Sequence, residues 1–341
     1  MCGWTGGIIP GKNAQCGTDG DGPATPANGN PIHARLGYKW QQERDFTDAS
    51  GRLRIERFYT SASKLDLGNL GSNWRHNFER SIRLSPSGNT AYVLRSNGLE
   101  LTFRRSGNAF VSDADISLRL TATFATQGGS IASWTLVDNR DQTEGYDAQG
   151  RLVSISYRDG QTLAFDYTTD GLLNRVRDTQ GRALWFSYEQ ATNSAALTRR
   201  ARITSISTPD GKTIRYAYNS NGMLSQVIYP DTTPTIDTDN PLRQYHYGEG
   251  TNATQTMLTG ITDESGQRYA SWRYDAQGRA WLSVHGNDTD YKDRVEQIYN
   301  SNGTTTVRTF QSATTFVDNV QSFVTTQGVV KLAANTQPCP T

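Results

Sequence analysis

Turn glycines recur along most of this chain, and within each run neighbouring glycines lie 9 to 12 residues apart. Several of them follow Asn or Asp, and Asn-Gly and Asp-Gly favour the left-handed turns of tight β-hairpins. Such closely spaced turns leave no room for long helices, so the spacing predicts a succession of β-hairpins. The glycines are Gly88, Gly98, Gly107, Gly150, Gly160, Gly171, Gly181, Gly211, Gly222, Gly266 and Gly278.

Apolar and polar residues alternate between these turns. Aromatic and β-branched side chains are common at the apolar positions, which is typical of half-buried antiparallel strands. The fold class predicted from this pattern is all-β, built of antiparallel hairpins. The clearest alternating sets are Leu163, Phe165 and Tyr167; Ile214, Tyr216 and Tyr218; and Ala270, Trp272 and Tyr274.

A sequence repeat underlies the turn spacing. Five tyrosines are followed four residues later by glycine, and a short polar residue comes directly after each tyrosine. Residues 146–151 and 274–279 both read Tyr-Asp-Ala-Gln-Gly-Arg. The pairs are Tyr146/Gly150, Tyr167/Gly171, Tyr218/Gly222, Tyr274/Gly278 and Tyr299/Gly303, and the polar residues are Asp147, Thr168, Asn219, Asp275 and Asn300.

These residue types suggest a structural role for each repeat position. The tyrosine ends one strand on its packed face, the short polar residue caps the turn, and the glycine takes the left-handed conformation. One hairpin cannot bury its own apolar face, so neighbouring hairpins must stack into a quasi-one-dimensional array. The strands at the ends of such an array remain open to pairing with another chain.

Composition excludes several classes of protein. The 341 residues carry 34 Lys and Arg against 33 Asp and Glu, a net charge of +1, which gives no field for gathering phosphates and argues against nucleic-acid binding. No apolar stretch is long enough for a transmembrane helix, and no secretory signal peptide is visible. The low apolar share, 35%, suits a curved sheet that buries one face of each strand.

Residues 1–31 contain 8 Gly and 4 Pro, so we interpret them as a looped leader. Residues 19–22, Asp-Gly-Asp-Gly, resemble part of a calcium loop but lack the downstream glutamate that such a loop needs. Cys2 and Cys16 lie close enough in sequence for a disulfide in an oxidising compartment, and free thiols are the alternative. Cys339 would have no partner.

The repeats resemble the YD repeats of bacterial RHS proteins and of their relatives, the toxin-complex C components and the teneurins. Residues 29–46, 53–61 and 70–82 resemble the segment that precedes those repeats. After the leader at 1–31, the resemblance implies an N-terminal RHS-type β module at 32–135 and a YD-repeat region at 136–341. It further implies that the hairpins spiral into a partly or wholly hollow β-shell.

In that family the shell encloses a C-terminal toxin, and a self-cleaving aspartyl segment plugs one end. This chain has no Asp-Pro dipeptide, so the family's Asp-Pro-x-Gly cleavage motif is missing, and no distinct domain follows the repeats. We therefore expect either a fragment of a longer RHS protein or a short member that assembles differently. The expected partners are a toxin cargo encoded downstream or further copies of the chain, and the expected location is secreted or on the bacterial surface.

Nothing in the sequence predicts catalysis, a cofactor or a metal site. The four histidines have no metal-ligand spacing, and residues 210–213 end like a phosphate-binding loop but lack its first glycine. Carboxylate pairs such as Asp263 with Glu264 and Asp288 with Asp290 lie in polar turns. The segment Trp74, Arg75, His76 and Asn77 is interpreted as a structural corner of the N-terminal module.

The predicted function is a non-enzymatic scaffold that encloses or carries cargo. One alternative is an extracellular module that binds cell-surface carbohydrate, because exposed Trp and Tyr rings can stack on sugars. Cross-strand packing is the preferred explanation for most of these rings. The other alternative is a self-assembling oligomer or filament that pairs through open sheet edges.

Overall fold

A computed structural model describes residues 27–62, 68–107, 109–114, 116–126, 129–189, 201–233, 239–326 and 329–337. Cys2, Cys16 and the Asp-Gly-Asp-Gly segment lie outside these ranges. The secondary-structure elements of the described residues are all β-strands, which confirms the all-β prediction. No described helix is long and apolar enough to cross a membrane.

Three groups of strands make up the described structure. A two-stranded ladder pairs β1 (Ala27–Asn28) with β2 (Ile32–His33), and a three-stranded sheet contains β3 (Trp40–Thr47), β4 (Arg54–Thr60) and β5 (Trp74–His76). The large sheet contains β6 (Ser81–Leu84), β7 (Thr90–Leu94), β8 (Glu100–Ser106), β9 (Ala109–Ser112), β10 (Arg119–Phe124), β11 (Ile131–Val137), β12 (Thr143–Asp147), β13 (Leu152–Ser156), β14 (Thr162–Tyr167), β15 (Leu173–Arg177), β16 (Ala183–Tyr188), β17 (Ile203–Ser207), β18 (Thr213–Tyr218), β19 (Leu224–Ile228), β20 (Leu242–Tyr247), β21 (Leu258–Thr262), β22 (Arg268–Tyr274), β23 (Ala280–His285), β24 (Val295–Tyr299), β25 (Thr305–Phe310), β26 (Phe316–Thr326) and β27 (Val329–Thr336).

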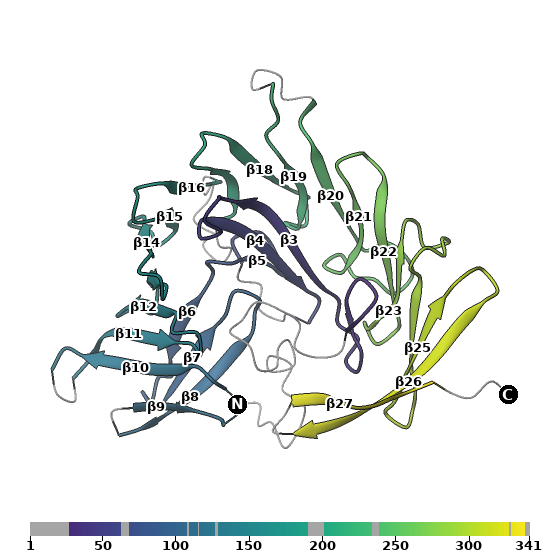
Figure 1. Cartoon of the computed structure of the whole chain (residues 1–341), viewed down its shortest axis with the longest axis horizontal. Helices are drawn as coiled ribbons and strands as arrows, with labels where there is room; N and C mark the ends of the chain where they lie inside the picture. Colours follow the sequence, from purple (N-terminus) through teal and green to yellow (C-terminus); the bar gives the residue numbers. More distant parts are fainter. Residues whose placement is uncertain are drawn as a thin grey trace.

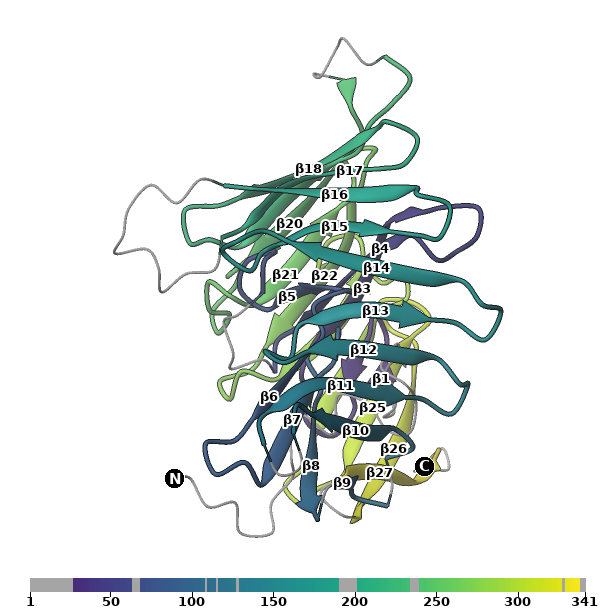
Figure 2. The ribbon, with the colours of Figure 1, turned by 90° about the vertical axis from the view of Figure 1, so that its left-hand side faces the viewer.

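The large sheet is antiparallel throughout, and its strands follow one another in chain order, stacked like rungs in Figure 2. Its order is that of a barrel in which β27 neighbours β6. Within the described residues, registers are seen for the consecutive pairs from β6 to β27 but not between β27 and β6. The described registers therefore define a curled sheet of antiparallel hairpins. The predicted module boundary at 135/136 falls inside β11, which pairs with β12 without a break.

The sheet curls around the three-stranded sheet, which lies on the inner side of its arc (Figure 1). Backbone contacts join the large sheet to the segments that lead into β3 and β5. Ile203 donates its amide to the carbonyl of Asn69 at 2.8 Å, and Ala280 donates to the carbonyl of Gly37. The apolar core lies between them and draws side chains from both sheets, among them Tyr59, Leu70, Trp74, Phe78, Phe165, Ile206, Leu224, Ile261 and Trp272.

Candidate functional site

The repeat turn is held by its aspartate. Oδ1 of Asp147 accepts the amides of Gln149 at 3.0 Å and Arg151 at 2.9 Å, and Oδ2 accepts Nε of Arg151 at 2.7 Å. Gly150 donates its amide to the carbonyl of Asp147 at 2.9 Å and has a φ of 78°, a conformation that favours glycine.

The second copy of the hexapeptide folds in the same way. Oδ1 of Asp275 accepts the amides of Gln277 at 3.0 Å and Arg279 at 2.9 Å, and Oδ2 accepts Nε of Arg279 at 2.8 Å. The remaining repeat glycines also have positive φ: Gly171 78°, Gly222 75°, Gly278 75° and Gly303 86°.

The repeat tyrosines link each hairpin to the one before it. Tyr167 donates its hydroxyl to the carbonyl of Leu152 at 2.7 Å, and Leu152 is the cross-strand partner of Tyr146. The same relation recurs from hairpin to hairpin, and we call the series the tyrosine ladder. Its other links are Tyr188 to Leu173 (2.8 Å), Tyr218 to Ile203 (2.7 Å), Tyr247 to Leu224 (2.6 Å), Tyr274 to Leu258 (2.8 Å) and Tyr299 to Ala280 (2.6 Å).

Two features of the backbone and solvent environment support this geometry. The register shifts by a bulge directly before each ladder tyrosine except Tyr299, so each of those rings is turned at the same place in its strand. Burial raises the pKa of Tyr167, Tyr188 and Tyr218 well above the usual value for tyrosine. The hydroxyls therefore stay protonated and act as donors at neutral pH.

Sequence reasoning missed Tyr188 and Tyr247, because neither is followed four residues later by glycine. In both cases a longer segment replaces the tight turn. Glu189 donates its amide to the carbonyl of Arg202 at 2.9 Å, and Gly248 donates its amide to the carbonyl of Met257 at 3.2 Å. A tyrosine at the end of an alternating strand, regardless of the turn that follows, is the signal that could have found them.

The arginine that ends the hexapeptide has two roles, and neither was predicted. Arg151 pairs with Asp147 and its guanidinium lies over the ring of Tyr167, the next ladder tyrosine, at 5.2 Å. Arg279 lies over Tyr299 at 4.2 Å in the same way. Each turn therefore also packs against the next hairpin through a cation–π contact.

The first repeat tyrosine, Tyr146, instead donates its hydroxyl to the buried carboxylate of Glu144. Glu144 also binds Arg95 at 2.6 Å and Arg80, which precedes β6. Burial alone would raise the pKa of Glu144, but the charges of Arg95 and Arg80 outweigh it and hold that pKa well below its usual value. This buried cluster fixes the start of the repeat region to the segment that enters the large sheet.

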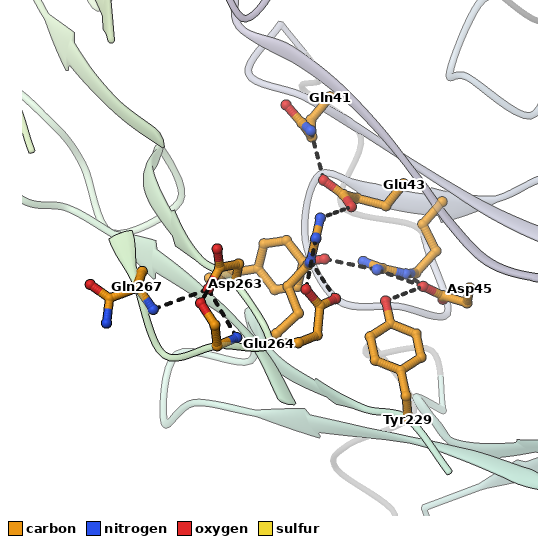
Figure 3. Close-up of polar contacts among 11 residues, drawn as sticks. Gln41, Glu43, Asp45, Tyr229, Asp263, Glu264 and Gln267 are labelled. Carbon is orange, nitrogen blue, oxygen red and sulfur yellow. Dashed lines mark hydrogen bonds and ion pairs between the residues drawn. The ribbon is translucent and has the colours of Figure 1, made fainter. Parts of the chain in front are cut away.

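A second buried cluster joins the three-stranded sheet of β3, β4 and β5, which we call the inner sheet, to the large sheet (Figure 3). Asp45 binds Arg57 through two hydrogen bonds, of 2.6 and 2.8 Å, and both side chains are completely buried. The hydroxyls of Tyr216 and Tyr229 donate to the same carboxylate at 2.8 and 2.9 Å. Arg57 also donates to the hydroxyl of Tyr245 at 2.8 Å. We call these five residues the inner junction.

The neighbouring carboxylate, Glu43, extends the contacts between the sheets. It accepts Nη1 of Arg243 at 2.6 Å, and Arg243 also holds Glu264 at 3.0 Å (Figure 3). Asp263 accepts the amides of Ser265 and Gln267 at 3.0 Å and so caps its own turn. The pair Asp263 and Glu264 thus has separate partners.

The predicted corner residues lie in and directly after β5. Trp74 donates Nε1 to the hydroxyl of Tyr247 at 2.8 Å, and Asn77 donates to the carbonyl of Arg54 at 3.2 Å. His76 is buried against Phe186 with ring centroids 5.5 Å apart, and Arg75 is buried beside it. Burial lowers the pKa of His76, which keeps its ring neutral.

The arrangement has little capacity for acid–base or metal chemistry. The carboxylates of both clusters are paired, and the described ranges contain no group of three His, Cys, Asp or Glu side chains that could hold a metal ion. Burial lowers the pKa of Lys39 well below its usual value, but this side chain is fully enclosed, with Nζ 4.2 Å from the ring centroid of Trp272. No substrate can reach it.

Two families match the chain in sequence. Residues 29–103 match a domain of unknown function, DUF6531, and residues 146–183 and 202–234 match the RHS Repeat. The chain contains RHS repeats. The predicted resemblance is confirmed, and the matched repeats include the ladder links of Tyr167 and Tyr218. No curated protein is significantly similar in sequence to this RHS-repeat protein.

Solved structures of toxin complexes resemble it weakly. The crystal structure of TcdB2-TccC3-TEV shares 12% identity, with 86% of this chain and 19% of that chain covered and a TM-score of 0.28. For the Photorhabdus luminescens Tc holotoxin pore the values are 13% identity, 89% and 21% coverage, and 0.23. The RHS-repeat protein therefore spans about a fifth of the length of these chains, and TM-scores this low do not establish a common arrangement.

Proposed function

We propose that this RHS-repeat protein is a non-enzymatic scaffold whose hairpin sheet forms part of a β-shell that carries or encloses a toxin or other cargo. The supporting observation is the position of the inner sheet: the curled hairpins already surround another part of the same chain. The tyrosine ladder gives the wall continuity, because each hairpin is bonded to its predecessor. We place this role in bacterial competition or secretion, outside the cell or on its surface.

The test begins with the gene. We expect the reading frame to continue past Thr341 into further Tyr-x-x-x-Gly hairpins and then into an unrelated C-terminal segment. In the protein purified from the whole gene, that segment should resist protease until denaturant opens the sheet. A stop codon directly after Thr341, or a C-terminal segment cleaved as fast in the native protein as in denaturant, would contradict enclosure.

A second candidate role is self-association through the end of the large sheet. Val324 of β26 and Leu332 of β27 are 50% and 40% exposed, and Phe316 is 43% exposed. Exposed apolar residues on terminal strands favour pairing with another chain. Light scattering on the purified chain tests this role: a monomer at every concentration would eliminate it.

A further inference from the structure

A surface cavity of about 540 Å³ lies where β22 begins, β23 ends and residues 286–294 lead into β24. It has no part in the inner junction or the tyrosine ladder. Its lining includes Asp263, Tyr269, His285, Asp290, Tyr291 and Lys292.

Two tyrosines of this cavity are exposed, unlike those of the ladder. Tyr269 is 41% and Tyr291 is 40% exposed. Each ring is supported by a neighbour: Tyr269 lies 5.1 Å from the ring of His285, and Tyr291 lies 5.9 Å from that of Phe310. Neither hydroxyl has a hydrogen-bond partner among the described residues. Supported rings with accessible surface are suited to stacking on a ligand.

Polar groups with spare bonding capacity lie beside these rings. Asp290 uses Oδ2 to accept the amide of Asn287 at 2.6 Å, and no bond to its Oδ1 is seen in the described structure. Asp263 caps its turn through Oδ1, and no hydrogen bond to its Oδ2 is seen in the described structure either. The ammonium of Lys292 also has no partner in the described ranges. The cavity therefore offers both acceptors and a donor next to apolar ring faces.

The loop that carries most of these groups is fixed in the absence of a ligand. His285 donates its amide to the carbonyl of Lys292 and Gly286 donates to that of Tyr269, both at 3.0 Å. Arg294 donates to the carbonyl of Asp288 at 2.6 Å. A preformed cavity with a few convergent polar groups is the usual form of a small-ligand site.

The charges select among ligands. Arg268 is engaged by Glu249 at 2.5 Å, and His285 is engaged by Asp293 at 2.8 Å. Among the lining groups of the described structure, the two negative charges of Asp263 and Asp290 then outnumber the one positive charge without an ion-pair partner, that of Lys292. This excess of negative charge disfavours an anionic ligand.

We propose that this cavity binds a neutral saccharide. The apolar C–H face of a sugar ring stacks on Tyr269 or Tyr291, and its hydroxyls bond the carboxylates of Asp263 and Asp290 and the ammonium of Lys292. The proposal is independent of the shell function, since it concerns a separate region of the surface.

The experiment exposes the full chain to an array of neutral glycans built from glucose, galactose, mannose and N-acetylglucosamine, and measures the affinity for the strongest binder by calorimetry. Tyr291→Ala and Asp290→Asn should each weaken binding about tenfold, the effect of losing one stacking or charged hydrogen-bonding contact. Trp185→Ala is the matched control, because Trp185 is 45% exposed on β16, outside the cavity. It should bind as the unmodified chain does.

Thermal unfolding of each variant separates loss of the site from loss of the fold, and Tyr291→Phe, which keeps the ring, should retain most of the affinity. Absence of binding to every neutral glycan overturns the proposal. Binding to anionic glycans alone overturns it too, as does binding that the cavity variants leave unchanged or that Trp185→Ala weakens equally.

Discussion

The hydroxyl of Tyr167 donates a 2.7 Å hydrogen bond to the carbonyl of Leu152, one hairpin earlier in the chain. Five further tyrosines repeat this relation along the sheet. The repeat therefore encodes more than a turn: its tyrosine connects hairpins, its aspartate and glycine shape the turn, and its arginine packs on the next tyrosine. These contacts explain why one hexapeptide can occur at both 146–151 and 274–279.

Removing one ladder hydroxyl should weaken the protein measurably. Tyr167→Phe keeps the ring but leaves the carbonyl of Leu152 without its donor, so we expect the free energy of unfolding to fall by about 1–2 kcal/mol. Tyr188→Phe should have a similar effect although Tyr188 has no repeat glycine. Urea denaturation gives both values.

Tyr92→Phe is the control for these variants. Within the described residues the hydroxyl of Tyr92 has no hydrogen bond, so its loss should change stability by less than about 0.5 kcal/mol. Equal effects of all three substitutions would refute the ladder as a stabilising feature.

The inner junction should be far more sensitive than an ion pair at the surface. Asp45→Asn leaves the buried guanidinium of Arg57 without a counter-charge, and we expect a loss of about 3–5 kcal/mol in unfolding free energy. Asp166→Asn, in a half-exposed pair with Arg175, should cost less than about 1 kcal/mol. Denaturant titration of the two variants tests the difference, and comparable losses would show that Asp45 does not hold the sheets together.

Features that depend on residues close together in the sequence could be predicted, whereas features that depend on distant residues could not. Turn glycines and period-two alternation are local patterns, so the hairpin fold and the repeat positions could be predicted. Tyr188 and Tyr247 were missed because longer segments replace the turn that marks the other repeats. The inner junction has no local signal at all: Asp45 meets Tyr216 across 171 residues, and no spacing in the sequence indicates that contact. The sugar-binding hypothesis could be stated, but the cavity around Tyr269 and Tyr291 required the structure.

Acid should destabilise the fold through His33. Burial lowers the pKa of His33 from 6.5 to about 3. Between these two pH values the imidazole of His33 is protonated in the unfolded chain but stays neutral in the folded chain. The stabilisation is complete above pH 6.5 and declines as the pH falls towards 3. At about pH 5 the loss amounts to about 2 kcal/mol relative to neutral pH.

His33→Asn isolates this effect. Nδ1 of His33 accepts the amides of Arg35 at 3.2 Å and Leu36 at 3.0 Å, and an asparagine oxygen can accept the same amides without titrating. Urea denaturation at both pH values should show a shallower acid loss for the variant. An unchanged pH dependence would mean that His33 does not contribute, with Lys39, His76 and Glu144 left as the other buried groups of lowered pKa among the described residues.

The contact between β6 and the first repeat turn can be tested with two glycines of almost the same backbone conformation. Gly150 and Gly160 have φ of 78° and 84°. A Cβ at Gly150 would lie 1.8 Å from the carbonyl oxygen of Ile82, whereas one at Gly160 would have nothing within 4 Å. Gly160→Ala should therefore cost only the strain of a left-handed alanine, about 1–2 kcal/mol.

Gly150→Ala adds to that strain a collision with backbone, which only a shift of β6 can relieve. We expect it to lose a further 1–3 kcal/mol or so beyond Gly160→Ala, the typical cost of overpacking. It should also break the 2.9 Å bond from the amide of Ile82 to the carbonyl of Gly150, which hydrogen exchange at Ile82 reports directly. Equal stability of the two variants, with the amide of Ile82 still protected, would show that β6 does not rest on the first repeat turn.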